Sequence, residues 1–121
     1  MSKSILIVDD SESIRELVAL TLESSGYQIE KGIDGKDALR FLDGRSFDLV
    51  ITDLNMPEMD GIELVREIRK HQLYSTVPIL MLTTESQAAR KDEAKAAGAT
   101  GWIVKPFVQD KLLQVVKKVV H

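Results

Sequence analysis

The sequence contains no cysteine, only 5% aromatic residues and no long apolar run. Without cysteine the chain forms neither disulfides nor thiolate metal sites, which is typical of a reducing compartment, so we expect a cytoplasmic location. No apolar run approaches the ~20 residues of a membrane span, and the first run, 5–8, leads into two aspartates; we therefore expect no signal peptide and no membrane insertion. The net charge of −3 is too mild for a nucleic-acid partner, and none is expected.

Four short apolar runs are typical of strands buried on both faces: residues 5–8, 49–51, 79–82 and 102–104. Residues 27–31 alternate apolar with polar side chains, which predicts a half-exposed edge strand. Apolar spacing predicts helices over 14–22, 35–43, 62–70 and 112–120, and the alanine-rich segment 87–97 is predicted as a further helix. Gly26 and Gly98 stand where two of these helices would end. The residues expected to share one face of the first helix are Ile14, Leu17, Val18, Thr21 and Leu22.

Strands that alternate with helices are joined by crossovers, so they run parallel and carry helices on both faces of the sheet. With right-handed crossovers and the alternating strand at an edge, the expected strand order is 2-1-3-4-5. The predicted fold class is α/β: a doubly wound five-stranded parallel sheet in a flavodoxin-like (βα)5 three-layer sandwich. The length suits one core. Since no linker is visible, we expect residues 1–121 to be a single domain with no separate output domain.

Polar residues follow four of the predicted strands at the point where each strand ends. They are Asp9, Asp10, Asp53, Thr83 and Lys105. Because the carboxyl ends of parallel strands meet at one edge of a sheet, these side chains should converge on one site. Each has a simpler explanation when taken alone. Asp10 and Thr83 could cap helices, whereas Asp53 could open a turn. Lys105 could be a solvated surface residue. The coincidence of all of them at one edge favours the site.

The chemistry of this edge follows from its charges. Three carboxylates close together repel one another, so some of them must be protonated or a cation must join them. Oxygen ligands without histidine or cysteine favour Mg²⁺ as that cation. The ammonium of Lys105 and the hydroxyl of Thr83 would then contact an anion. A nucleophilic carboxylate beside a metal, an ammonium and a hydroxyl describes a phosphoryl-transfer site. No G-x-x-x-x-G-K-[ST] loop is present, which argues against ATP as the direct donor. Neither histidine follows a predicted strand, so a phosphohistidine would have to come from a partner.

In these features the chain resembles the receiver-domain family, and most closely its single-domain chemotaxis-type members, the CheY-like proteins. The matching segments are ILIVDD at 5–10, DLVITDLNMPEMDG at 48–61, LTT at 82–84 and KPF at 105–107. The resemblance covers essentially the whole chain, which would make residues 1–121 a single receiver domain. It implies that Asp53 is the phosphoacceptor and that Thr83 and Lys105 contact phosphoryl oxygens.

The resemblance also implies a magnesium site and a switch. The implied Mg²⁺ ligands are Asp9 (largely through water), Asp10, Asp53 and the backbone carbonyl of Asn55. Thr83 and Trp102 would form the switch pair, with Trp102 at a position that is often Tyr or Phe in the family. Packing at the edge of the sheet is the alternative role for Trp102. The family usually has a cis peptide at the bond that is Lys105–Pro106 here.

The implied function is that of a two-component response regulator. It would accept a phosphoryl group from a sensor histidine kinase or a chemotaxis kinase, and would switch partner binding rather than turn over a substrate, with self-catalysed phosphorylation and autodephosphorylation. The output partner could be a flagellar motor switch protein in chemotaxis or a phosphotransfer protein; a phosphorelay intermediate or a phosphate sink are further possibilities. A small aspartate-nucleophile phosphatase is an alternative of another class, although Asn55 stands where such enzymes usually carry an acid/base Asp. A pseudo-receiver that only binds partners is a third.

The alanine-rich helix over 87–97 is predicted to be the most loosely held, because small side chains make few dispersion contacts. A close-packed helix that does not move is the alternative. The residues expected to face the core are Ala88, Ala89, Ala94, Ala96 and Ala97.

Overall fold

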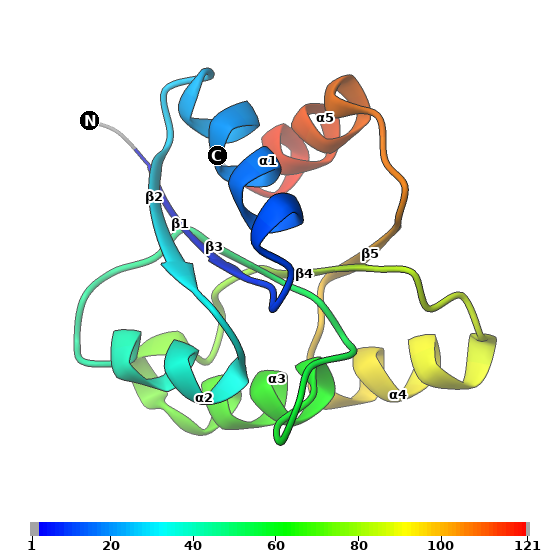
Figure 1. Ribbon diagram of the computed structural model, residues 1–121. Helices are drawn as coiled ribbons and strands as arrows, with labels where there is room; N and C mark the ends of the chain where they lie inside the picture. Colours follow the sequence, from blue (N-terminus) through cyan, green and yellow to red (C-terminus); the bar gives the residue numbers. More distant parts are fainter. Residues whose placement is uncertain (1–2, 121) are drawn as a thin grey trace.

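The computed structural model describes residues 3–120 and contains one parallel sheet with the strand order β2-β1-β3-β4-β5 (Figure 1). The strands are β1 (Ser4–Val8), β2 (Gln28–Gly32), β3 (Leu49–Thr52), β4 (Ile79–Thr83) and β5 (Gly101–Val104). Both the order and the edge position of the alternating strand were predicted. Residues 1, 2 and 121, which belong to the predicted single domain, lie outside the described residues.

Helices cover both faces of this sheet (Figure 1). On one face lie α1 (Glu12–Glu23) and α5 (Gln109–Val119), and on the other lie α2 (Gly35–Ala38), α3 (Gly61–Lys70) and α4 (Ala88–Ala97). Short 3₁₀ turns follow α2 at Leu39–Phe41 and α3 at Gln72–Tyr74. The flavodoxin-like three-layer sandwich is therefore confirmed. Between residues 3 and 120, no helix has the length and the apolar character to cross a membrane.

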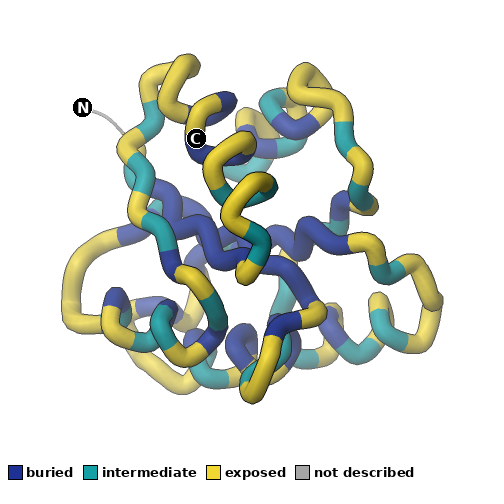
Figure 2. The backbone as a smooth tube through the Cα atoms, viewed as in Figure 1, coloured by how far each residue is buried: buried dark blue, intermediate teal, exposed yellow. Residues whose placement is uncertain are grey.

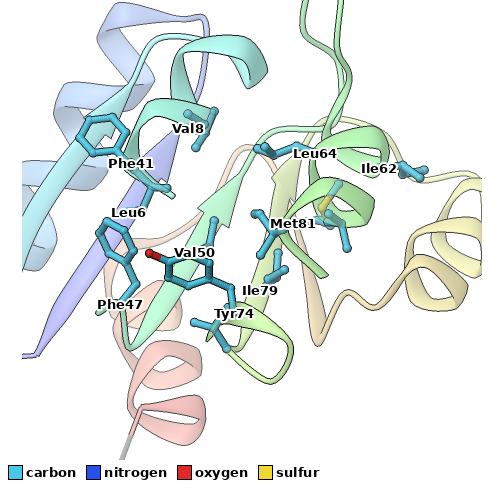
Figure 3. Packing of buried hydrophobic residues seen from close by; sticks show 14 of the residues in the cluster. Leu6, Val8, Phe41, Phe47, Val50, Ile62, Leu64, Tyr74, Ile79 and Met81 are labelled. Atoms are coloured by element: carbon cyan, nitrogen blue, oxygen red, sulfur yellow. The ribbon is translucent and has the colours of Figure 1, made fainter. Parts of the chain in front are cut away.

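The central strands are buried, as Figure 2 shows. Their side chains alternate between two apolar layers, one on each face of the sheet. Leu6 and Val50 point into the layer beneath α2 and α3, where Phe41, Phe47 and Tyr74 also pack (Figure 3). Neighbouring strand residues enter the opposite layer with α1 and α5. Strands with this double burial show apolar runs, whereas β2 at the edge keeps exposed residues on one side.

The helices predicted over 35–43 and 14–22 differ from the structure in length and in buried face, respectively. The helix predicted over 35–43 ends at Ala38 and tightens into a 3₁₀ turn, which places Ala38 and Phe41 on one face, and both are buried. On α1, Leu17 is 39% exposed rather than buried, and Ala19 contacts the core in its place. Apolar spacing predicted that these segments are helical, but the orientation of each helix on the sheet decided which residues are covered.

The alanine-rich helix α4 buries fewer residues against the core than predicted. Ala94 is its one buried residue and Ala97 is half-buried, whereas Ala88, Ala89 and Ala96 are exposed. The predicted core-facing set was therefore wrong for three of its five members. Alanine is the strongest helix former and is indifferent to exposure, so an alanine-rich helix does not reveal its buried face.

Gly61, the first residue of α3, lies against the backbone at the end of β3. A Cβ atom on Gly61 would stand 2.2 Å from the carbonyl oxygen of Asp53 and 2.9 Å from the Cα of Leu54. The Gly61 N–H donates to the Leu54 carbonyl at 2.8 Å. Only glycine allows α3 to approach this closely, and the approach fixes the backbone that carries Asp53.

We predict that Gly61→Ala lowers the free energy of unfolding by at least about 2 kcal/mol, because the added methyl group meets backbone atoms that cannot move aside. Gly101→Ala is the matched control: its Cβ would meet the tip of the Leu80 side chain at 2.8 Å, and a side-chain tip yields more easily than backbone. The control should cost about 1 kcal/mol or less. Urea denaturation of both variants measures this, and equal losses would contradict the proposed backbone contact.

Candidate functional site

The carboxyl edge of the sheet collects the charged residues predicted from the sequence. Val8 of β1 pairs in register with Thr52 of β3, so Asp9 and Asp53 leave adjacent strands at the same level. Both are buried, with 3% and 9% exposure, whereas Asp10 is exposed. Carboxylate oxygens of Asp9, Asp10 and Asp53 all lie within 4.8 Å of one another, an arrangement that could hold a metal ion.

Lys105, just beyond β5, joins two of these carboxylates. Its Nζ donates to Asp9 Oδ2 at 2.9 Å and to Asp53 Oδ2 at 3.2 Å. Burial alone would lower the pKa of Lys105, but the hydrogen bonds and charges of the two aspartates together outweigh it, and the pKa of Lys105 is raised. Lys105 therefore stays charged, and it is a partly buried ion-pair partner rather than a solvated surface residue.

Asp9 experiences the opposite balance. Burial raises the pKa of the Asp9 carboxyl, because the hydrogen bonds from Lys105 and the Ser11 N–H do not fully replace its lost hydration, and the charge of Asp53 adds to the effect. The backbone carbonyl of Asp9 also accepts a hydrogen bond of 2.7 Å from the Arg15 guanidinium. The acidic cluster thus retains an unfavourable charge balance, which a divalent cation would relieve.

The carboxylate of Asp53 has a fixed orientation. Its Oδ1 accepts hydrogen bonds from the N–H groups of Leu54 at 2.7 Å and Asn55 at 3.4 Å, while its Oδ2 accepts from Lys105. The bond to Asn55 has the spacing of an Asx turn, so the simpler role of Asp53 in opening a turn coexists with its place in the site. Each oxygen of this carboxylate has a different environment.

Helix capping, the simpler explanation for Asp10 and Thr83, does not hold. Ser11 caps α1, since its Oγ accepts from the Ile14 N–H at 3.4 Å. The residue before α4 is Gln87, and no side chain caps that helix. Ser11 lies directly after the aspartates and could have been identified as the cap from the preference of serine for that position.

Thr83 and Trp102 meet at the backbone of Glu85. The Glu85 N–H donates to Thr83 Oγ1 at 3.2 Å, and the indole N–H of Trp102 donates to the Glu85 carbonyl at 3.1 Å. Thr83 is fully buried and Trp102 is half-buried. One backbone residue therefore connects the hydroxyl at the site to the indole, and a backbone contact of this kind leaves no signature in the sequence.

Two remaining expectations concern the loops at this edge. Asn55 is exposed beside Asp53, and its backbone N–H contacts the site. The Lys105–Pro106 peptide bond is cis, as the resemblance implied.

Comparison with known proteins agrees with this arrangement. The chain matches the model of the response regulator receiver domain over residues 5–117. It is 40% identical to chemotaxis protein CheY-3 of Vibrio cholerae, covering 95% of this chain and 89% of that one. The structure of the chemotaxis protein CheY4 of Vibrio cholerae is similar, with a TM-score of 0.95 and 46% identity over 99% of this chain and 100% of that one. A response regulator of Thermotoga maritima, TrrA, solved in complex with Mg²⁺ and BeF, has a TM-score of 0.86 and 39% identity over 98% and 99% of the two chains.

We predict that Asp9→Asn stabilises the metal-free protein at neutral pH. The raised pKa means that the folded protein keeps its proton on Asp9 at a pH where the unfolded chain has lost it, so stability falls as pH rises through the folded pKa. The amide removes that loss, so the free energy of unfolding of Asp9→Asn should exceed that of the parent protein near neutral pH. The gain should shrink as pH falls toward 3.8, the ordinary pKa of the group.

Urea denaturation in the presence of a chelator, over a series of pH values, measures this gain. Asp92→Asn, at an exposed carboxylate of α4, is the control and should have nearly the same free energy of unfolding as the parent protein. An Asp9→Asn protein that is less stable than the parent near neutral pH would contradict the cost assigned to burial.

Proposed function

Since this chain belongs to the response regulator receiver domain family, we propose that it is a two-component response regulator in which Asp53 is the residue that accepts the phosphoryl group. The donor is a phosphohistidine on a sensor histidine kinase or a chemotaxis kinase. The observation that carries the proposal is the buried Asp53 carboxylate with one oxygen fixed by backbone N–H groups and the other paired with Lys105 at 3.2 Å. An acceptor held in one orientation favours in-line attack.

In the proposed step, a carboxylate oxygen of Asp53 attacks the phosphorus of the phosphohistidine. The new O–P bond forms as the N–P bond breaks, and the electron pair returns to the imidazole of the donor. Lys105 moves its hydrogen bond to a phosphoryl oxygen and stabilises the charge there, and the hydroxyl of Thr83 donates to another. Water later attacks the acyl phosphate and releases inorganic phosphate, which restores the carboxylate. In both steps, the residues that assist the reaction belong to this protein.

The acidic cluster fits a resident Mg²⁺, which when bound would neutralise charge on the transferring group. Asp9, Asp10 and Asp53 supply carboxylate oxygens, and the carbonyl of Asn55 would add a backbone ligand. Hard oxygen ligands of this kind suit Mg²⁺, and the similar TrrA protein was solved with that ion. Magnesium is therefore the proposed cofactor.

The signal would leave the site through Glu85. A phosphoryl group that attracts Thr83 takes the hydroxyl away from the Glu85 N–H, and the loop shift that follows disturbs the bond between Trp102 and the Glu85 carbonyl. Trp102 then changes its position at the edge of α4 and β5. The ligand acts by favouring one of two arrangements of these groups, as a switch requires.

The output surface is proposed to be a groove of about 450 Å³ beside Trp102. Val104 and Val108 expose 39% and 67% of their surface there, and Lys91 and Lys111 stand at its rim. Apolar side chains flanked by lysines suit an amphipathic acidic segment of a partner. The chemotaxis names of the relatives favour a role in chemotaxis, in which the partner would be a flagellar motor switch protein. A phosphotransfer protein of a phosphorelay is the second candidate for this surface, and a phosphate sink would use no output partner.

The acceptor chemistry is tested by intact mass after incubation with acetyl phosphate or with beryllofluoride, a stable phosphoryl mimic. We expect one phosphoryl adduct that needs Mg²⁺ and is absent from Asp53→Asn, because the amide oxygen is a far weaker nucleophile. Asp48→Asn is the control carboxylate and should be phosphorylated like the parent protein. A protein that forms no adduct and does not bind the mimic would be a pseudo-receiver.

The switch is tested by fluorescence, since Trp102 is the single tryptophan of the chain. Adding Mg²⁺ and beryllofluoride should change its emission, because the indole N–H and its surroundings change. In Thr83→Ala the mimic should still bind Asp53 but the change in emission should be smaller by at least about half, since the connection through Glu85 is lost. An undiminished change in this variant would show that Trp102 responds by a route that excludes Thr83.

A further inference from the structure

Helix α4 is attached to the rest of the protein by polar contacts at its two ends. Between them its core contact is small, because Ala94 alone is buried. The neighbour with which α4 makes most of its contacts is α3. What holds α4 in place is therefore to be found in the side chains that cross between these two helices.

The C-terminal end of α4 is anchored by Arg69 of α3. The guanidinium donates two hydrogen bonds to the carbonyl of Gly98, at 3.2 and 2.7 Å, and further bonds to the carbonyls of Tyr74 and Val77, at 3.0 and 2.6 Å. One side chain thus ties the end of α4 to the chain that leads into β4. Gly98 leaves space for this contact, since a Cβ there would lie 2.9 Å from Arg69 Nε. Four charge-assisted bonds in a partly buried place make a firm attachment.

The N-terminal end of α4 is held differently. No side chain caps its first turn. Arg90 pairs with Asp60 at 3.3 Å across the two helices and with Glu93 at 2.6 Å within α4, and Arg66 of α3 reaches Glu93 at 3.7 Å. These side chains are 29–52% exposed. Ion pairs in such places are weak and are screened by salt.

Asp60 connects this end of α4 to the backbone of the phosphoacceptor. It caps α3, with its Oδ1 accepting from the Glu63 N–H at 2.8 Å, while its Oδ2 accepts from Arg90 at 3.3 Å. The next residue is Gly61, which packs on the carbonyl of Asp53. The pair between Asp60 and Arg90 therefore joins α4 to the Asp53 segment by a path that includes neither Thr83 nor Trp102.

We propose that the Asp60–Arg90 ion pair is a latch that holds the N-terminal turns of α4 against α3, and that α4 pivots about Arg69 when the latch opens. The latch stabilises the conformation of the protein without a phosphoryl group. Its role in switching rests on the proposed function, but its effect on α4 does not, because the contacts exist in the unphosphorylated chain. The C-terminal end of α4, which Arg69 holds, stays in place while the N-terminal end moves.

Hydrogen exchange of the unphosphorylated protein tests the latch. Arg90→Met keeps the helix-forming aliphatic stem and removes the charge, so amides of residues 90–93 should exchange about two- to fivefold faster, the range expected for a partly exposed ion pair. Amides of residues 96–99, at the Arg69 end, should be unchanged. Salt should produce a similar local increase in the parent protein and a smaller one in Arg90→Met, where the pair between Arg66 and Glu93 remains. Lys95→Met is the control, since this exposed lysine of the same helix forms no ion pair with any residue between 3 and 120.

Unchanged exchange at 90–93, an equal increase at 96–99, or the same effect in Lys95→Met would each overturn the latch. A second measurement tests its role in switching: in Arg90→Met, the emission of Trp102 should respond at about two- to fivefold lower beryllofluoride, because a weaker latch opens at lower cost. An unchanged midpoint would overturn that role. If neither protein binds beryllofluoride, the proposed function fails, whereas the exchange result still decides whether the latch exists.

Discussion

The charge balance at the carboxyl edge of the sheet is the constraint on which the rest of the structure depends. Two buried aspartates and a third exposed one share this edge with a single ammonium. The strand order determines how these residues come together. Asp9 and Asp53 lie side by side because β1 and β3 are neighbours, whereas β5, which leads to Lys105, lies two strands from β3. That separation is about 10 Å, and only a long side chain such as that of Lys105 covers it. Lysine suits this place because its ammonium group is a point charge. It can donate its hydrogen bonds to carboxylate oxygens or to phosphoryl oxygens without needing a particular planar geometry.

The same strand order explains why the signal passes through backbone groups. β4 lies between β3 and β5, so Thr83 ends its strand between the phosphoacceptor and the strand that carries Trp102. Glu85, two residues later, meets the hydroxyl through its N–H and the indole through its carbonyl. The N–H and the carbonyl of Glu85 belong to the two peptide groups that meet at its Cα, so a displacement of this residue that breaks the first contact also disturbs the second. The Glu85 side chain accepts a hydrogen bond from the Gln87 N–H at 3.3 Å within the same loop.

Much of the fold could be predicted because strands that are buried on both faces consist of continuous apolar residues. The ends of those apolar runs also predicted where the site lies. Asp9, Asp53 and Lys105 were found in this way, and the structure places them in contact. The predictions failed where residue type does not determine environment. The alanines of α4 did not indicate which face of that helix is covered. The helical pattern over 35–43 did not reveal the 3₁₀ turn that brings Phe41 into the core. Glu85 acts through its backbone and Gly61 through the absence of a side chain, so residue type alone did not show what either of them contacts. The roles of Asp53, Thr83, Trp102 and the metal ligands stay predictions.

The attachment of α4 fits a switch that must operate with little free energy. A helix buried through several large apolar side chains would cost several kcal/mol to displace, since about 1.5–3 kcal/mol accompanies each such side chain. The single buried residue of α4 is an alanine, and an exposed ion pair adds only about 0.2–1 kcal/mol. New contacts to one phosphoryl group, each a charge-assisted hydrogen bond of about 1.5–3 kcal/mol, are therefore large enough to move this helix. The Arg69 anchor then has a clear physical purpose: it keeps so lightly held a helix from leaving the sheet altogether, so that a small free energy produces a defined rotation rather than local unfolding.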